Sequence, residues 1–92
     1  MSRLEEKLAV LGYRKRYEPY FYKEITLNSL LFCIYIFIED NKIFVAKMSI
    51  ADENIAYPTV ETQQDIDNIQ QAFNEMQKDL EELKQYEESN VK

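Results

Sequence analysis

Carboxylates are the only abundant reactive side chains in this sequence, which contains one cysteine and no histidine. Without histidine there is no Ser-His-Asp or Cys-His arrangement, and the most common general base is missing. Cys33 lies amid apolar neighbours, where a thiol acts as a small hydrophobic side chain. One glycine is too few for a glycine-rich phosphate loop. We therefore expect no enzyme, no catalytic residue, no metal and no cofactor.

Basic and aromatic side chains are interleaved in one segment near the N-terminus. The patch consists of Tyr13, Arg14, Lys15, Arg16, Tyr17 and Lys23. Aromatic rings can stack on bases while cations hold phosphates, so this mixture is typical of surfaces that bind nucleic acid. Glu18 and Glu24 interrupt the positive charge, and basic side chains lying over tyrosine rings would give the same pattern. Nucleic-acid binding through Tyr13–Lys23 is the alternative functional hypothesis.

The negative charge is concentrated in the last third of the chain. Residues 1–61 have eight basic and nine acidic side chains, whereas residues 62–92 have three basic and eight acidic ones. Glu75, Asp79 and Glu82 could present an acidic helix face to a basic groove on a partner protein, as a nucleic acid does. The other interpretation is an ordinary solvated helix face.

Two segments have the pattern of capped helices, which we expect over residues 3–11 and 63–87. Ser2 precedes Glu5 by three residues, and Thr62 precedes Asp65 by three, so each pair can form a capping box. Gly12 is placed to end the first helix in a left-handed conformation. Apolar residues of the second helix recur at spacings of three and four: Ile66, Ile69, Phe73, Met76, Leu80 and Leu83. This pattern indicates a helix lying on its own sheet, or alternatively a helix pair across a dimer.

Three strands are expected between the helices, over residues 20–25, 30–38 and 43–50. Pro19 disfavours a helix before the first of them, which we place at the edge of the sheet. Residues 39–42 form a turn in which Asp40 and Asn41 tolerate positive φ. Residues 55–57 could add a short strand. The chain is thus expected to be one α+β domain, residues 1–92: a short helix, a three-stranded antiparallel meander and a long amphipathic helix.

The strand over residues 30–38 is apolar on both faces. Phe32, Ile34, Ile36 and Ile38 point one way, and Leu31, Cys33, Tyr35 and Phe37 point the other. The helices can cover one face, so the second is either closed by the first helix and loops or exposed as an interaction site. For the interaction site, the expected partner-binding residues are Tyr20, Tyr22, Tyr35 and Phe37.

The ends of the chain carry a resemblance. The segments Leu4–Leu8, Leu11–Tyr13 and Thr62–Leu80 resemble those of small phage or prophage accessory proteins of low-GC Gram-positive bacteria. The resemblance implies a mobile-element protein without an assigned activity, and it brings no catalytic residues. We therefore expect a non-enzymatic protein-interaction module that binds or inhibits a host protein, either alone or as a homodimer.

The sequence also bears on where the protein works. Residues 1–8 are charged and do not resemble a signal peptide. The longest apolar run, Leu30–Ile38, is far shorter than the roughly 20 residues of a membrane-spanning helix. We therefore expect a protein of the bacterial cytoplasm with no membrane partner.

Overall fold

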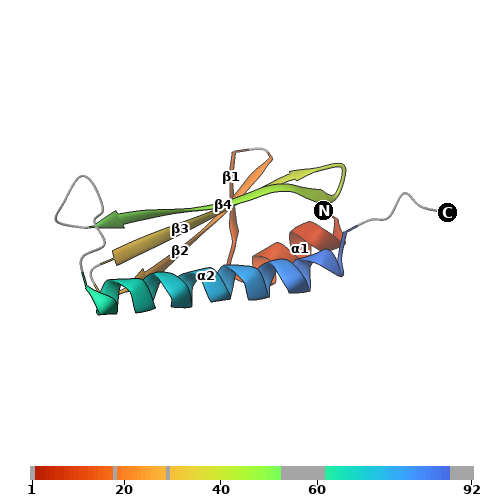
Figure 1. Ribbon diagram of the computed structural model, residues 1–92. Helices are drawn as coiled ribbons and strands as arrows, with labels where there is room; N and C mark the ends of the chain where they lie inside the picture. The colour runs from red at the N-terminus through yellow and green to blue at the C-terminus, as the bar shows by residue number, and fades with distance from the viewer. Residues whose placement is uncertain (1, 18, 29, 53–61, 88–92) are drawn as a thin grey trace.

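The computed structural model describes residues 2–17, 19–28, 30–52 and 62–87, which form a sheet with two helices on one side. The elements are α1 (Arg3–Val10), β1 (Arg14–Tyr17), β2 (Tyr20–Leu27), β3 (Leu30–Glu39), β4 (Lys42–Asp52) and α2 (Gln63–Lys84). The strands pair in sequence order, each antiparallel to the next. Figure 1 shows α1 and α2 side by side below the sheet. The expected α+β fold, with a short first helix and a long last one, is confirmed.

The expected number of strands was wrong, because Arg14–Tyr17 adds a fourth strand, β1. Strand β1 pairs with the start of β2, so Tyr20–Leu27 is not the outermost strand there. Four residues, three of them basic, have no apolar alternation that would mark them as a strand. Their extended form comes from hydrogen bonding to β2, which sequence periodicity does not report. The short strand considered for residues 55–57 lies outside the described residues.

Both helices begin with the capping boxes that their sequences predict. The Glu5 backbone N–H donates to Ser2 Oγ at 3.1 Å, and the Ser2 N–H donates to the Glu5 carboxylate at 3.1 Å. Thr62 and Asp65 exchange the equivalent bonds at 3.1 and 3.2 Å. Gly12 follows α1 with a φ of +98°, as expected for a residue that ends a helix.

A two-residue turn joins β3 to β4, and the hairpin contains an irregularity beside it. Asp40 and Asn41 have φ values of +55° and +59°, which confirms the expected turn. Ile38 is opposite Ile43, but Phe37 is opposite Val45, so Phe44 is an extra residue in β4. Such a bulge changes the face to which the following side chains point.

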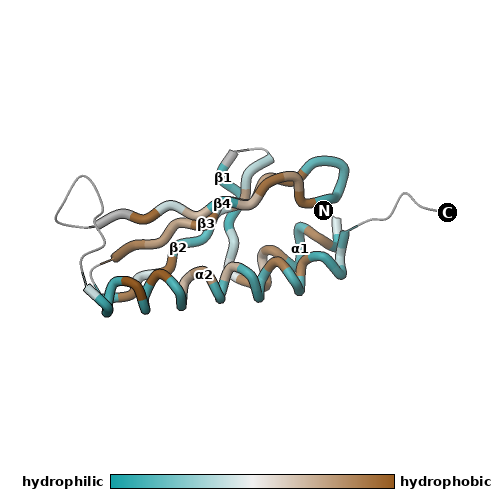
Figure 2. The backbone as a smooth tube through the Cα atoms, in the orientation of Figure 1, coloured by the Kyte–Doolittle hydropathy of each residue, from teal (hydrophilic) through white to brown (hydrophobic). Residues whose placement is uncertain are grey.

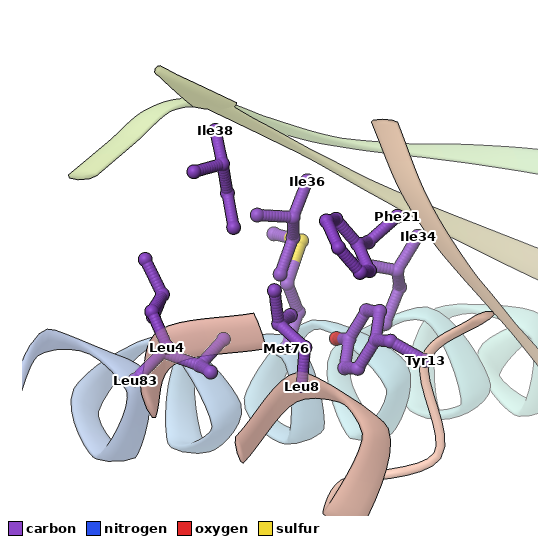
Figure 3. Packing of buried hydrophobic residues seen from close by; sticks show 9 residues of the cluster. All are labelled: Leu4, Leu8, Tyr13, Phe21, Ile34, Ile36, Ile38, Met76 and Leu83. Atoms are coloured by element: carbon purple, nitrogen blue, oxygen red, sulfur yellow. The ribbon is translucent and has the colours of Figure 1, made fainter. Parts of the chain in front are cut away.

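The core fills the layer between the sheet and the helices. Strand β3 contributes Ile34, Ile36 and Ile38, and α1 contributes Leu4 and Leu8, all of which point into this layer (Figure 3). A second group of buried side chains, Leu30, Phe32 and Ala72, extends the core along α2. Of the two apolar faces expected for β3, the one with Phe32, Ile34, Ile36 and Ile38 therefore packs on the helices.

Helix α2 lies on its own sheet, and four residues of the expected seam, Ile69, Met76, Leu80 and Leu83, pack on the core. The buried row is Asn68, Ala72, Met76, Asp79 and Leu83, whereas Ile66 and Phe73 are 49% and 41% exposed. Figure 2 shows polar and apolar residues alternating along this helix. The spacing of the apolar residues alone does not set the rotation of α2, because the row that is buried against the sheet includes small and polar side chains. Neither described helix has both the length and the apolar character needed to cross a bilayer.

Candidate functional site

The face of the sheet opposite the helices, here called the open face, brings together the four aromatic residues expected to bind a partner. In the strand register, Tyr20 is opposite Phe37, and Tyr22 is opposite Tyr35. The Tyr20 ring meets the Phe37 ring edge-on at 4.9 Å between centroids, and the Tyr22 and Tyr35 rings lie 5.1 Å apart. Directly opposed residues of antiparallel strands share a face, so these rings form one cluster.

The four rings are not equally accessible. Tyr22 is buried, with 6% of its surface exposed, while Tyr20, Tyr35 and Phe37 are half-buried. The Tyr22 hydroxyl donates to the Glu24 carboxylate and lies 3.8 Å from Cys33 Sγ. Burial, followed by these two contacts, raises the pKa of Tyr22 above its ordinary value. Tyr22 therefore supports its neighbours, and the other three rings are the accessible part of the cluster.

Three basic side chains surround this cluster on the open face. The Arg16 guanidinium lies 5.0 Å from the centre of the Tyr22 ring. The Lys47 ammonium lies 5.7 Å from the ring centres of both Tyr20 and Tyr35. Arg14 joins them, because it is opposite Tyr22 in the register. These distances are within the range of cation–π attraction.

A hollow of about 250 Å³ lies within this group, lined by Arg16, Tyr20, Tyr35 and Lys47. Its lining combines two aromatic side chains with two cations. No residue of the described part forms an ion pair with Arg16 or Lys47. The hollow therefore presents positive charge that the described protein does not neutralise.

Beside the cluster, the bulge in β4 leaves two successive apolar side chains exposed. Phe44 is 65% exposed and Val45 is 43% exposed. The Phe44 ring lies 5.6 Å from the Phe37 ring, so it continues the aromatic cluster toward the end of the hairpin. We call Phe37, Phe44 and Val45 the apolar end of the open face.

The basic-aromatic segment of the sequence does not form one surface. Arg14 and Arg16 belong to the open face, whereas Tyr13 and Lys23 face the helices. Lys15 is opposite Phe21, a core residue, and is exposed at the margin of the sheet. Strand alternation separates neighbours in the sequence onto opposite faces. Tyr17 is part of β1, but its side chain lies outside the described part of the structure.

Tyr13 and Lys23 instead meet the acidic helix in a buried cluster. Asp79 Oδ2 accepts from the Tyr13 hydroxyl at 2.9 Å and from Lys23 Nζ at 2.7 Å. Lys23 also donates to the Leu11 carbonyl oxygen at 3.1 Å and lies 3.4 Å from the Glu75 carboxylate. Burial and the neighbouring Asp79 raise the pKa of Tyr13, so its phenol stays protonated and donates.

This cluster changes the interpretation of the acidic helix face. Asp79 is 5% exposed and is occupied by Tyr13 and Lys23, so it does not face solvent with Glu75. Glu75 is exposed, and Glu82 is half-buried. The three carboxylates therefore do not make a uniform acidic surface.

Comparison with known proteins adds no assignment to this geometry. No protein-family model, curated protein or solved structure matches the chain. In the described ranges, no group of three Asp, Glu, Cys or His side chains is placed to hold a metal ion. The functional argument therefore depends on the open face itself.

Proposed function

We propose that this chain is a non-enzymatic protein-binding module that docks a partner protein on the apolar end of its open face. The observation that carries the proposal is Phe44, a large apolar side chain that is 65% exposed next to the Phe37 ring. Full burial of a phenylalanine contributes roughly 1.5–3 kcal/mol, and aromatic side chains are frequent in the energetic centres of interfaces. A partner that covers Phe37, Phe44 and Val45 would gain this free energy.

The partner that fits this surface best is a different protein rather than a second copy. Two open faces packed against each other would bring Arg14, Arg16 and Lys47 of both copies into one interface, where Glu24 offsets only part of the positive charge. Like charges in a desolvated interface are unfavourable. If the resemblance to phage accessory proteins holds, the partner is a host protein whose activity the chain inhibits.

The test compares two exposed phenylalanines on different surfaces, Phe44 (65% exposed) and Phe73 (41% exposed). The tagged protein is used to capture a partner from a bacterial host lysate, and the dissociation constant is then measured with the purified partner. We expect Phe44→Ser to raise this constant at least about tenfold, which corresponds to about 1.4 kcal/mol. Phe73→Ser on α2 is the matched control, because Phe73 is also exposed and lies away from the open face.

Two results would count against the proposal. One is a partner that binds wild type and Phe44→Ser equally well. The other is an equal loss with Phe73→Ser, which would place the interface on α2. Circular dichroism of both variants checks that neither substitution changes the helix content.

A further inference from the structure

We propose that the hollow lined by Arg16, Tyr20, Tyr35 and Lys47 binds a nucleotide, with the phosphate on the two cations and the base on the tyrosine rings. This proposal goes beyond protein docking, because the residues that line the hollow are different from Phe37, Phe44 and Val45 of the apolar end. The ligand chemistry is the same whether the nucleotide is free or part of a single strand.

The first argument is the charge of the hollow. The chain has a net charge of −6, yet Arg16 and Lys47 contact rings and, within the described residues, no carboxylate. The guanidinium of Arg16 offers several N–H donors in a plane that matches phosphate oxygens. Lys47 adds a compact charge from β4, the outer strand at the other edge of the sheet from β1. A phosphate would thus satisfy two cations together.

The second argument is the fixed position of the two tyrosine rings. The Tyr20 and Tyr35 ring centroids lie 6.4 Å apart with their planes at 88°, so the edge of one ring packs toward the face of the other and both rings line the hollow. Phe37 supports the Tyr20 ring at 4.9 Å, and Tyr22 supports the Tyr35 ring at 5.1 Å. Rings held in this way lose little conformational entropy on binding. Stacking of a base on such a ring contributes about 1–3 kcal/mol.

The third argument concerns the form of nucleic acid that could enter. In a duplex the bases are stacked inside, and their faces do not reach a tyrosine ring on a protein surface. The hollow has a volume of about 250 Å³ and opens on a sheet surface, which suits one unstacked nucleotide. Phosphates of neighbouring nucleotides in a strand could reach Arg14, which is on the same face.

The experiment measures binding of fluorescent oligo(dT) by anisotropy and binding of AMP by amide chemical shifts. We expect Arg16→Ala and Lys47→Ala each to raise the dissociation constant of oligo(dT) about tenfold. Tyr35→Leu should have a similar effect through lost stacking. Lys84→Ala is the matched control, because it removes the same charge from an exposed position at the end of α2. Binding should also weaken as salt is raised.

The outcomes separate the two sources of the ligand and the two proposals. Binding of oligo(dT) without AMP supports a strand, and equal binding of AMP supports a free nucleotide. Lack of binding by both probes overturns the inference, as does a loss with Lys84→Ala equal to that with Lys47→Ala. Polyglutamate binding as tightly as oligo(dT) would also overturn it. Phe44→Ser should keep nucleotide binding, so failure of one proposal leaves the other measurable.

Discussion

Individual side chains in this protein take their roles from partners that are distant in the sequence. Asp79 lies in an acidic helical segment, but it is 66 residues from Tyr13 and 56 from Lys23, the two donors that it binds. The Lys23 and Asp79 side chains are 15% and 7% exposed. Their hydrogen bonds join α2 to β2 and to the residues that follow α1. This cluster therefore holds the two layers in register rather than offering charge to a partner.

Asp79→Asn tests the contribution of the cluster to stability. Removing one partner of a buried ion pair costs about 3–5 kcal/mol, because the remaining charge is left buried. Glu75 lies 3.4 Å from Lys23 and compensates in part, so we expect a loss near the lower end, about 3 kcal/mol. Urea unfolding measures the change. Glu75→Gln is the control, and we expect less than about 1 kcal/mol from this half-exposed pair. Equal losses for the two variants would contradict a special role of Asp79.

At the scale of elements, the bulge in β4 decides which side chains reach the open face. In a regular hairpin with the same turn, Tyr35 would be opposite Ala46, whereas in the structure it is opposite Lys47. The extra residue Phe44 thus moves Val45 and Lys47 outward and leaves Ala46 and Met48 packed against the core. Both proposed sites depend on this single shift.

The end of α1 provides a second test at the scale of elements. Gly12 has a φ of +98°, which an L-residue with a side chain adopts at a cost of about 1–2 kcal/mol. A Cβ atom at Gly12 would lie 3.8 Å from Lys23 Cδ, an ordinary contact, so backbone strain is the expected cause of any loss. We predict that Gly12→Ala lowers the free energy of unfolding by about 1–2 kcal/mol, as measured by thermal unfolding.

Asn28→Gly is the matched variant for Gly12→Ala. Asn28 also has positive φ, at 58°, but there glycine relieves strain instead of introducing it. We expect its free energy of unfolding to change by less than about 0.5 kcal/mol. A comparable loss of unfolding free energy in both variants would contradict backbone strain at positive φ as the cause of the loss in Gly12→Ala.

In the whole molecule, charge and apolar surface are divided between the two sides of the sheet. The side with the helices carries the acidic α2, while the open face carries Arg14, Arg16 and Lys47 around aromatic rings, with Glu24 bound to Tyr22. This division explains how a chain with a net charge of −6 can present a basic aromatic surface. It also bears on self-association, because two open faces would repel each other.

We therefore expect light scattering at micromolar concentration and low salt to give the mass of one chain, 11.0 kDa. Repulsion between the open faces is strongest when salt does not screen it. A species of twice this mass that Phe44→Ser converts to one chain would contradict the expectation and support a homodimer through the open face. If Phe73→Ser has this effect instead, the dimer forms through α2.

The sequence by itself determined the elements whose causes are local. The capping residues before each helix, Gly12 after α1 and the Asp40–Asn41 turn all act through bonds and φ values within a few residues. The alternation of side chains in β3 likewise identified its two faces and grouped Tyr35 with Phe37. The sequence of β4 also contains a signal for the bulge. Its core-facing residues are Ile43, Ala46 and Met48, so the spacing between them is three and then two, as one extra residue in a strand produces.

Tertiary structure alone decided what depends on pairing between distant segments. Strand β1 is extended because β2 pairs with it, and α2 is rotated because the sheet accepts Ala72 and Asp79 in place of Ile66 and Phe73. The same pairing divided the basic-aromatic segment between two faces and placed Lys47 beside Tyr20. Periodicity reports which residues can share a face of one element. Which element packs on each face depends on the free energy of packing whole layers together, and the sequence of a single segment does not determine this free energy.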